Sequence, residues 1–132
     1  MDPSTTFMIV TGAHLQAEAS DRPWAYWLRE RLEAAAGADA RVYVCSDLWY
    51  LNNDELRGLP TIAVGGPEVN ALSAYLASRL PSVVAVEGKW VVLMEPEGGT
   101  PLACCWGKSS QETGAAVEAF AQRHLGAFIA GA

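Results

Sequence analysis

The sequence has few positive charges and no long apolar run. Nine lysine and arginine residues stand against fifteen aspartate and glutamate residues, giving a net charge of −6, and the basic residues are scattered along the chain. We therefore expect no nucleic-acid partner, because binding to phosphates needs a clustered basic surface. The first residues carry no basic segment and only a short apolar run. We expect no secretory signal, no membrane span and a cytoplasmic location.

Cysteine and histidine are scarce as well. The three cysteines form no CxxC pair, and the two histidines belong to no HExxH motif. An odd number of unpaired cysteines favours reduced thiols over a disulfide framework. The missing ligand spacings lead us to assign neither a metal nor a cofactor.

The chain does have enough apolar material for one core. Of its 132 residues, 51% are hydrophobic, and we find no repeat or linker, so we expect a single domain over residues 1–132. Five tryptophans are many for this length. Together with an exposed hairpin edge and the apolar C-terminal segment AFIAGA, they favour a homo-oligomer.

The stretch TIAVGGPEVNALSAYLASRL at residues 61–80 organises the rest. It reads as a buried strand, a turn at Gly65 and Gly66, and an amphipathic helix with Pro67 in its first turn. The N–H groups at such a helix start can hold an anion, with the Asn70 amide one turn further along. A purely structural turn is the alternative, because Glu68 places a negative charge where the anion would lie.

Elsewhere in the chain, short apolar runs predict strands and amphipathic periods predict helices. We expect strands at 7–11, 41–46, 83–86, 90–94 and 102–106, and helices at 21–36 and 109–129. The order predicts an α/β protein, namely a three-layer sandwich with a mostly parallel central sheet. We expect a Rossmann- or flavodoxin-like strand order and a C-terminal antiparallel hairpin extension, joined by the loop EPEGGTP at 95–101.

In such sheets a ligand lies beyond the carboxyl ends of the strands. This rule selects a ligand-binding rim that the turn after the last strand can join: Gly12, His14, Asp47, Gly65, Gly66, Asn70, Lys108 and Ser109. The GKS letters at 107–109 are not a P-loop, because Leu102 stands where the motif needs glycine. Ser109 and Glu112 have the spacing of a helix capping box instead.

A catalytic interpretation uses the same rim. Asp47 with His14 or Cys105 supplies the residue types of a nucleophilic hydrolase or transferase, although no local motif supports the set. The alternatives are a solvated loop histidine and a buried cysteine that packs like a small apolar residue.

Two segments resemble a known family. VGGPEVN at 64–70 and GKSSQETGAA at 107–116 are similar to the α/β modules of bacterial cell-wall-binding repeats and surface-layer proteins, over residues 61–120. The resemblance rests on glycine turns, implies an α/β fold and transfers no functional residue.

The sequence therefore leaves three functions open. The first is binding of a small ligand, an anion among the options, or of a protein partner at the carboxyl ends of the strands. The second is a hydrolase or transferase at that rim, and the third is a homo-oligomeric assembly subunit.

Overall fold

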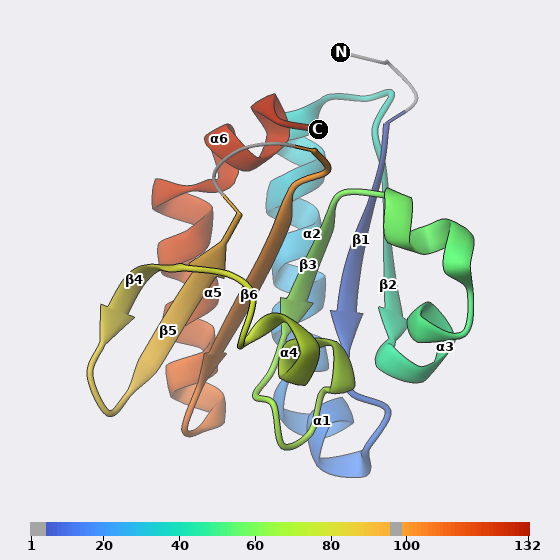
Figure 1. Cartoon of the computed structure of the whole chain (residues 1–132). Coiled ribbons are helices and arrows are strands. Elements are labelled where there is room, and N and C mark those ends of the chain that lie inside the picture. The colour runs from blue at the N-terminus through green and yellow to red at the C-terminus, as the bar shows by residue number, and fades with distance from the viewer. Residues whose placement is uncertain (1–4, 96–98) are drawn as a thin grey trace.

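The described residues of the chain form one six-stranded sheet with helices around it (Figure 1). The computed structural model describes residues 5–95 and 99–132. The sheet has the order β2-β1-β3-β6-β5-β4. Its strands are β1 (Thr6–Thr11), β2 (Arg41–Ser46), β3 (Thr61–Val64), β4 (Ser82–Val86), β5 (Trp90–Met94) and β6 (Leu102–Gly107).

The sheet is mixed. β2, β1, β3 and β6 run parallel to one another, whereas β5 is antiparallel to both β6 and β4. The structure thus confirms an α/β fold with antiparallel strands near the C-terminus. β6 lies inside the sheet beside β3, so the predicted hairpin is not simply appended at an edge. Residues 96–98 of the predicted loop lie outside the described residues.

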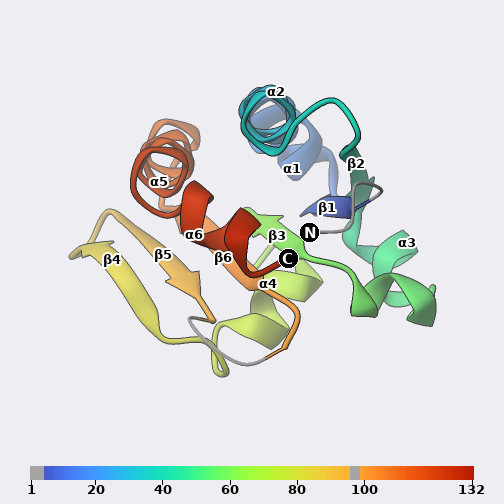
Figure 2. The same ribbon diagram turned by 90° about the horizontal axis from the view of Figure 1, so that it is seen from above.

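Helices cover both faces of this sheet, as the view in Figure 2 shows. One face carries α1 (Leu15–Ser20), α2 (Arg22–Ala36), α5 (Ser110–Arg123) and α6 (Leu125–Ala130). The other face carries only short elements: α3 (Asp47–Leu51), the 3₁₀ helix η1 (Asp54–Gly58) and α4 (Ala71–Leu76). None of the helices in the described ranges is long and apolar enough to cross a membrane.

Alternation along the strands builds a separate apolar core on each face. Phe7 and Ile9 of β1 pack against α2, α5 and α6, whereas Met8 and Val10 pack toward α3 and α4. The adjacent cysteines of β6 behave in the same way. Cys105 belongs to the first core and Cys104 to the second, and both are fully buried.

Three helical expectations need correction. The helix predicted from Pro67 to Leu80 is limited to α4, because Asn70 rather than Pro67 begins it. The last helix is divided at His124, whose backbone leaves helical geometry (φ −126°, ψ −8°). The sequence pattern does not predict the short helices α1 and α3, since each spans less than two turns and shows no clear hydrophobic period.

The apolar C-terminus is part of the core. Phe128 is fully buried, and Leu125 is 6% exposed. These two side chains are therefore packed inside the molecule. The large apolar side chains exposed beside the edge strand β2 are Tyr43, Leu48 and Trp49. The homo-oligomer itself stays a prediction.

Candidate functional site

Asp47 lies where the carboxyl ends of β1, β2 and β3 meet, as the sequence predicts. Its carboxylate is 5% exposed and accepts hydrogen bonds from three backbone N–H groups. Oδ1 accepts from Ala13 at 3.1 Å and from Leu48 at 2.7 Å, and Oδ2 accepts from Ala71 at 2.7 Å. The side chain thus ties the end of β1 and the start of α4 to the end of β2.

Asn70 is committed to the fold in the same way. Its Oδ1 accepts from the N–H groups of Leu72 and Ser73, which caps α4. Its Nδ2 donates to the carbonyl oxygens of Val10 and Val64, each at 3.0 Å. All four bonds are buried, so this amide holds β1, β3 and α4 together.

The predicted anion site is therefore occupied by the protein itself. The N–H groups of residues 71, 72 and 73, at the start of α4, all have side-chain acceptors in Asp47 and Asn70. Two further carboxylates approach the glycine turn. A Cβ on Gly65 would lie 2.5 Å from an oxygen of Asp21, and a Cβ on Gly66 would lie 2.5 Å from an oxygen of Glu68. Negative charge at this turn opposes an anion.

The glycines of the rim serve close packing. A Cβ on Gly12 would collide with the backbone carbonyl of Val69, and Gly65 has a φ of +114°, which favours glycine. Both are buried in the turn region. Gly66 has ordinary φ, and its nearest neighbour is the flexible Glu68 side chain. The structure explains Gly12 and Gly65 without a ligand.

Asp21 is a titratable group that the sequence interpretation treated only as a helix start. It is 5% exposed, and its carboxylate makes no capping hydrogen bond although it precedes α2. Burial, and after it the charge of Glu68, raises its pKa from 3.8 to about 6. Nothing in a single sequence brings residues 21 and 68 together, because their proximity depends on where α2 begins and where β3 ends.

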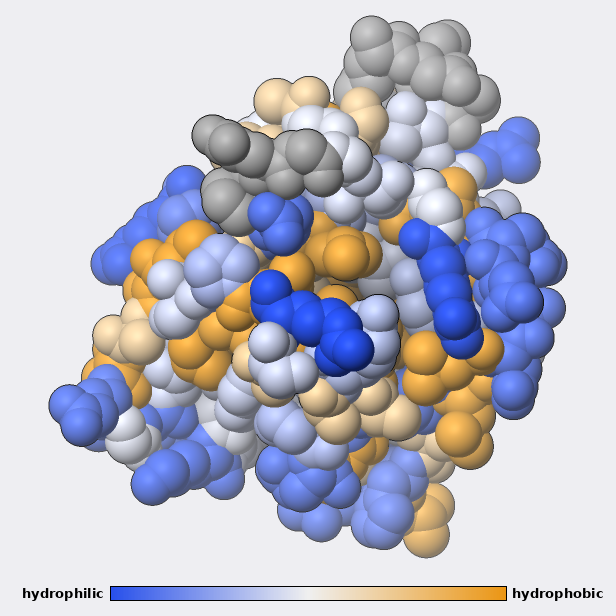
Figure 3. All heavy atoms as spheres, in the orientation of Figure 1, coloured by the Kyte–Doolittle hydropathy of each residue, from blue (hydrophilic) through white to orange (hydrophobic). Residues whose placement is uncertain are grey.

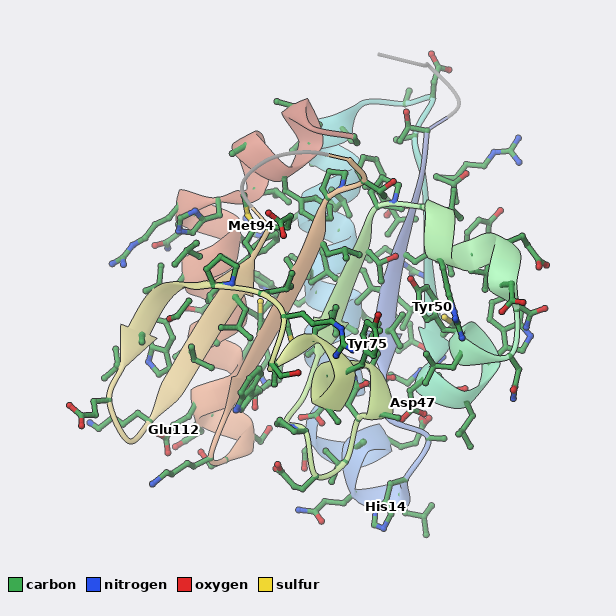
Figure 4. All side chains as sticks on the ribbon, viewed as in Figure 1. His14, Asp47, Tyr50, Tyr75, Met94 and Glu112 are labelled. Atoms are coloured by element: carbon green, nitrogen blue, oxygen red, sulfur yellow. The ribbon has the colours of Figure 1, made fainter. Side chains whose placement is uncertain are left out.

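The predicted catalytic residues do not form a set. The His14 side chain is exposed and caps α1 by accepting from the N–H of Gln16 at 3.2 Å. Figure 4 shows it at the outer end of the molecule, beyond Asp47. Cys105 is fully buried, and burial raises the pKa of its thiol well above the usual value. Within the described ranges, no hydrogen bond joins any two of these three side chains.

Lys108 and Ser109 begin α5 at the same pole. The Ser109 hydroxyl accepts from the N–H of Glu112 at 3.2 Å, which confirms it as the cap of the last long helix. The Lys108 side chain is exposed, and its backbone N–H donates to the carbonyl of Lys89. Ser109 thus has a structural role, and Lys108 remains a charge on the rim.

A separate hollow of about 220 Å³ opens on the face that carries α3, η1 and α4. It is more enclosed than the wider surface grooves, such as one of about 610 Å³ between α2 and α5. Figure 3 shows that hydrophobic and strongly hydrophilic side chains lie next to one another on this face of the molecule. We call it the α3–α4 hollow; its lining residues are Tyr50, Leu51, Arg57, Leu72, Tyr75 and Leu102.

Two tyrosines frame this hollow from opposite elements, Tyr50 on α3 and Tyr75 on α4 (Figure 4). Tyr50 is 2% exposed, and its hydroxyl is 3.1 Å from that of Thr61 on β3. Tyr75 is exposed, and the guanidinium of Arg79 lies 3.8 Å from the centroid of its ring. The buried Tyr50 thus forms a fixed wall of the hollow, and the exposed Tyr75 forms a wall that faces solvent.

The sequence did not predict this hollow. It lies between α4 on one side and α3 and η1 on the other, with Leu102 of β6 in its lining, so it depends on how these separate elements pack. One signal in the sequence is the bulky apolar segment LWYL at 48–51, which supplies Tyr50 and Leu51 to the hollow.

Comparisons with known proteins identify no relative. No known family matches the chain, no curated protein matches it, and no solved structure matches it. The resemblance to cell-wall-binding modules therefore stays a prediction, and function must be argued from the geometry.

Proposed function

We propose that this protein binds a small organic molecule in the α3–α4 hollow. One observation carries the proposal: an enclosed hollow with apolar walls has a few polar groups at its margin, namely Tyr75 and Arg57. Small-molecule sites combine apolar walls with few orienting groups in this way. The site lies over the sheet face at the start of β6, away from the strand ends where the sequence placed it.

Binding without catalysis is supported by the chemistry of the lining. The hydroxyl of Tyr50 faces Thr61, and burial raises its pKa above 10.0, so it is not a base at neutral pH. The hydrolase or transferase hypothesis depends on Asp47 and Cys105. Asp47 is held by backbone N–H donors, and Cys105 is buried in the core. The geometry thus favours a binding protein over that enzyme.

We also propose a cellular location and a fold relationship for this protein. We place the protein in the cytoplasm, which suits its three free cysteines. We also propose that the fold is related to doubly wound Rossmann- or flavodoxin-like proteins, on the strength of the order β2-β1-β3 and the helices on both faces.

The test is a titration followed by ¹H–¹⁵N NMR, with 3-phenylpropionate as the probe. We expect the shifted amides to cluster in residues 50–57 and 71–76 and at Leu102. The variant Leu102→Phe adds bulk to the hollow and should weaken binding at least about fivefold, whereas Leu15→Phe, at an 85% exposed position, should not. Shifts confined to the turns at Gly12 and Gly65, or equal binding by both variants, would contradict this location.

A further inference from the structure

We infer that the ligand of the α3–α4 hollow is a small organic carboxylate and that Arg57 receives its negative charge. The inference rests on the binding function proposed above. Among the six described lining residues there is one charged side chain, that of Arg57, and no acid. In a chain with a net charge of −6, an acid-free hollow with a guanidinium in its wall is a local reversal of charge.

Arg57 has donors left for a ligand. Its Nη2 donates to the carbonyl of Leu51 at 2.9 Å and is 3.8 Å from the carboxylate of Asp54. Both side chains of that ion pair are largely exposed, so the pair is weak and easily exchanged. A guanidinium presents its N–H groups as a fork that matches the two oxygens of a carboxylate.

The charge of Arg57 acts inside the hollow. It opposes the effect of burial on Tyr50, since a nearby positive charge lowers the pKa of a phenol. Tyr50, whose ring is buried, and three leucines line the hollow beside Arg57, whose own side chain is 55% exposed. A carboxylate bound there would meet less screening than on open surface.

The opposite wall carries a second positive charge. Arg79 stacks on Tyr75 and donates to its carbonyl at 3.0 Å. The guanidinium therefore stays close to the ring that lines the hollow. Arg57 and Arg79 thus place positive charge on both sides of the hollow, which favours an anionic ligand over a cationic one.

The size limits the ligand. A volume of about 220 Å³ corresponds to roughly seven waters at their liquid volume. This space suits a body of about ten non-hydrogen atoms, such as an aromatic or branched aliphatic acid, and it excludes a nucleotide. Leu51, Leu72 and Leu102 supply the apolar contacts for that body.

The test compares 3-phenylpropionate with 3-phenylpropan-1-ol, which has the same body without the charge, by NMR titration of the wild type, Arg57→Gln and Arg31→Gln. Arg31 is the matched control, since it lies on α2, where it stacks on Trp27 at 4.7 Å. We expect the carboxylate to bind about tenfold more tightly than the alcohol. The preference should fall severalfold in Arg57→Gln, persist in Arg31→Gln and shrink at high salt.

The affinities for the acid and the alcohol distinguish failure of the inference from failure of the proposed function. Equal affinity for acid and alcohol at the hollow, or an equal loss in the two arginine variants, overturns the inference and leaves the proposed function standing. Failure of both compounds to shift the residues of the hollow overturns the inference and the proposed function together.

Discussion

The carboxylate of Asp47 accepts a hydrogen bond from the backbone N–H of Ala71 at 2.7 Å, so the residue that follows β2 holds the first residue of α4 in place. The same carboxylate also holds Ala13 after β1. Two strand ends and the start of α4 are thereby joined by a side chain that the sequence suggests as a ligand contact or catalytic group. The predicted rim thus holds strand ends and α4 together, and the binding site that we propose lies on the face beside α4.

Replacing Asp47 with alanine should therefore destabilise the protein. Three backbone donors would lose their acceptor in a nearly closed environment, which we expect to lower the free energy of unfolding by about 2–4 kcal/mol. Urea unfolding followed by circular dichroism measures the effect. The control is Asp39→Ala, at an exposed loop position, which should stay within about 0.5 kcal/mol. Equal stability of the two variants would contradict the structural role.

Asp21 should make the protein less stable as pH rises from about 4 to about 6. Its pKa is raised from 3.8 to about 6, so in this range the folded protein binds a proton that the unfolded chain releases. The variant Asp21→Asn should remove this part of the pH dependence and gain about 1–2 kcal/mol above pH 7. Unfolding curves of both proteins at pH 4, 5.5 and 7.5 test the sign. A variant that loses stability at pH 7.5 would show that the charged carboxylate stabilises the fold.

Gly12 should not tolerate a side chain. A Cβ there would collide with the carbonyl of Val69, which is backbone and cannot move aside without shifting the start of α4. We expect Gly12→Ala to cost about 3 kcal/mol or more. Gly58→Ala is the matched change, since a Cβ there meets nothing within 4 Å, and it should cost less than about 1 kcal/mol. Thermal melts of the two variants measure the difference, and similar melting temperatures would refute the close approach.

The sequence predicted the fold well where periodicity is long or strong. The apolar runs became β1, β2 and β3, and the pattern from Asp21 to Gly37 became α2. It did less well for short elements, since six residues such as those of α1 carry too few turns to show a period. The start of α4 likewise involves the Asn70 amide, which donates to the carbonyl of Val10, sixty residues away.

The site could be predicted only in part. The topological rule brought Asp47, Asn70 and Gly65 to one place, and the structure confirms that they meet there. The rule could not show that these polar groups are already hydrogen-bonded within the protein, because the bonds from Asp47 to Ala13 and Ala71 and from Asn70 to Val10 join segments far apart in the sequence. The α3–α4 hollow could not be predicted from the sequence, since it depends on how the short helices α3, η1 and α4 pack on the sheet.

The most direct test of the account is a crystal structure of the protein with 3-phenylpropionate. We predict the phenyl ring between Tyr75 and Leu102 and the carboxylate within hydrogen-bonding distance of Arg57. The compound bound at the Gly65–Gly66 turn beside Asp47, with the hollow empty, would contradict the account and return the site to the strand ends.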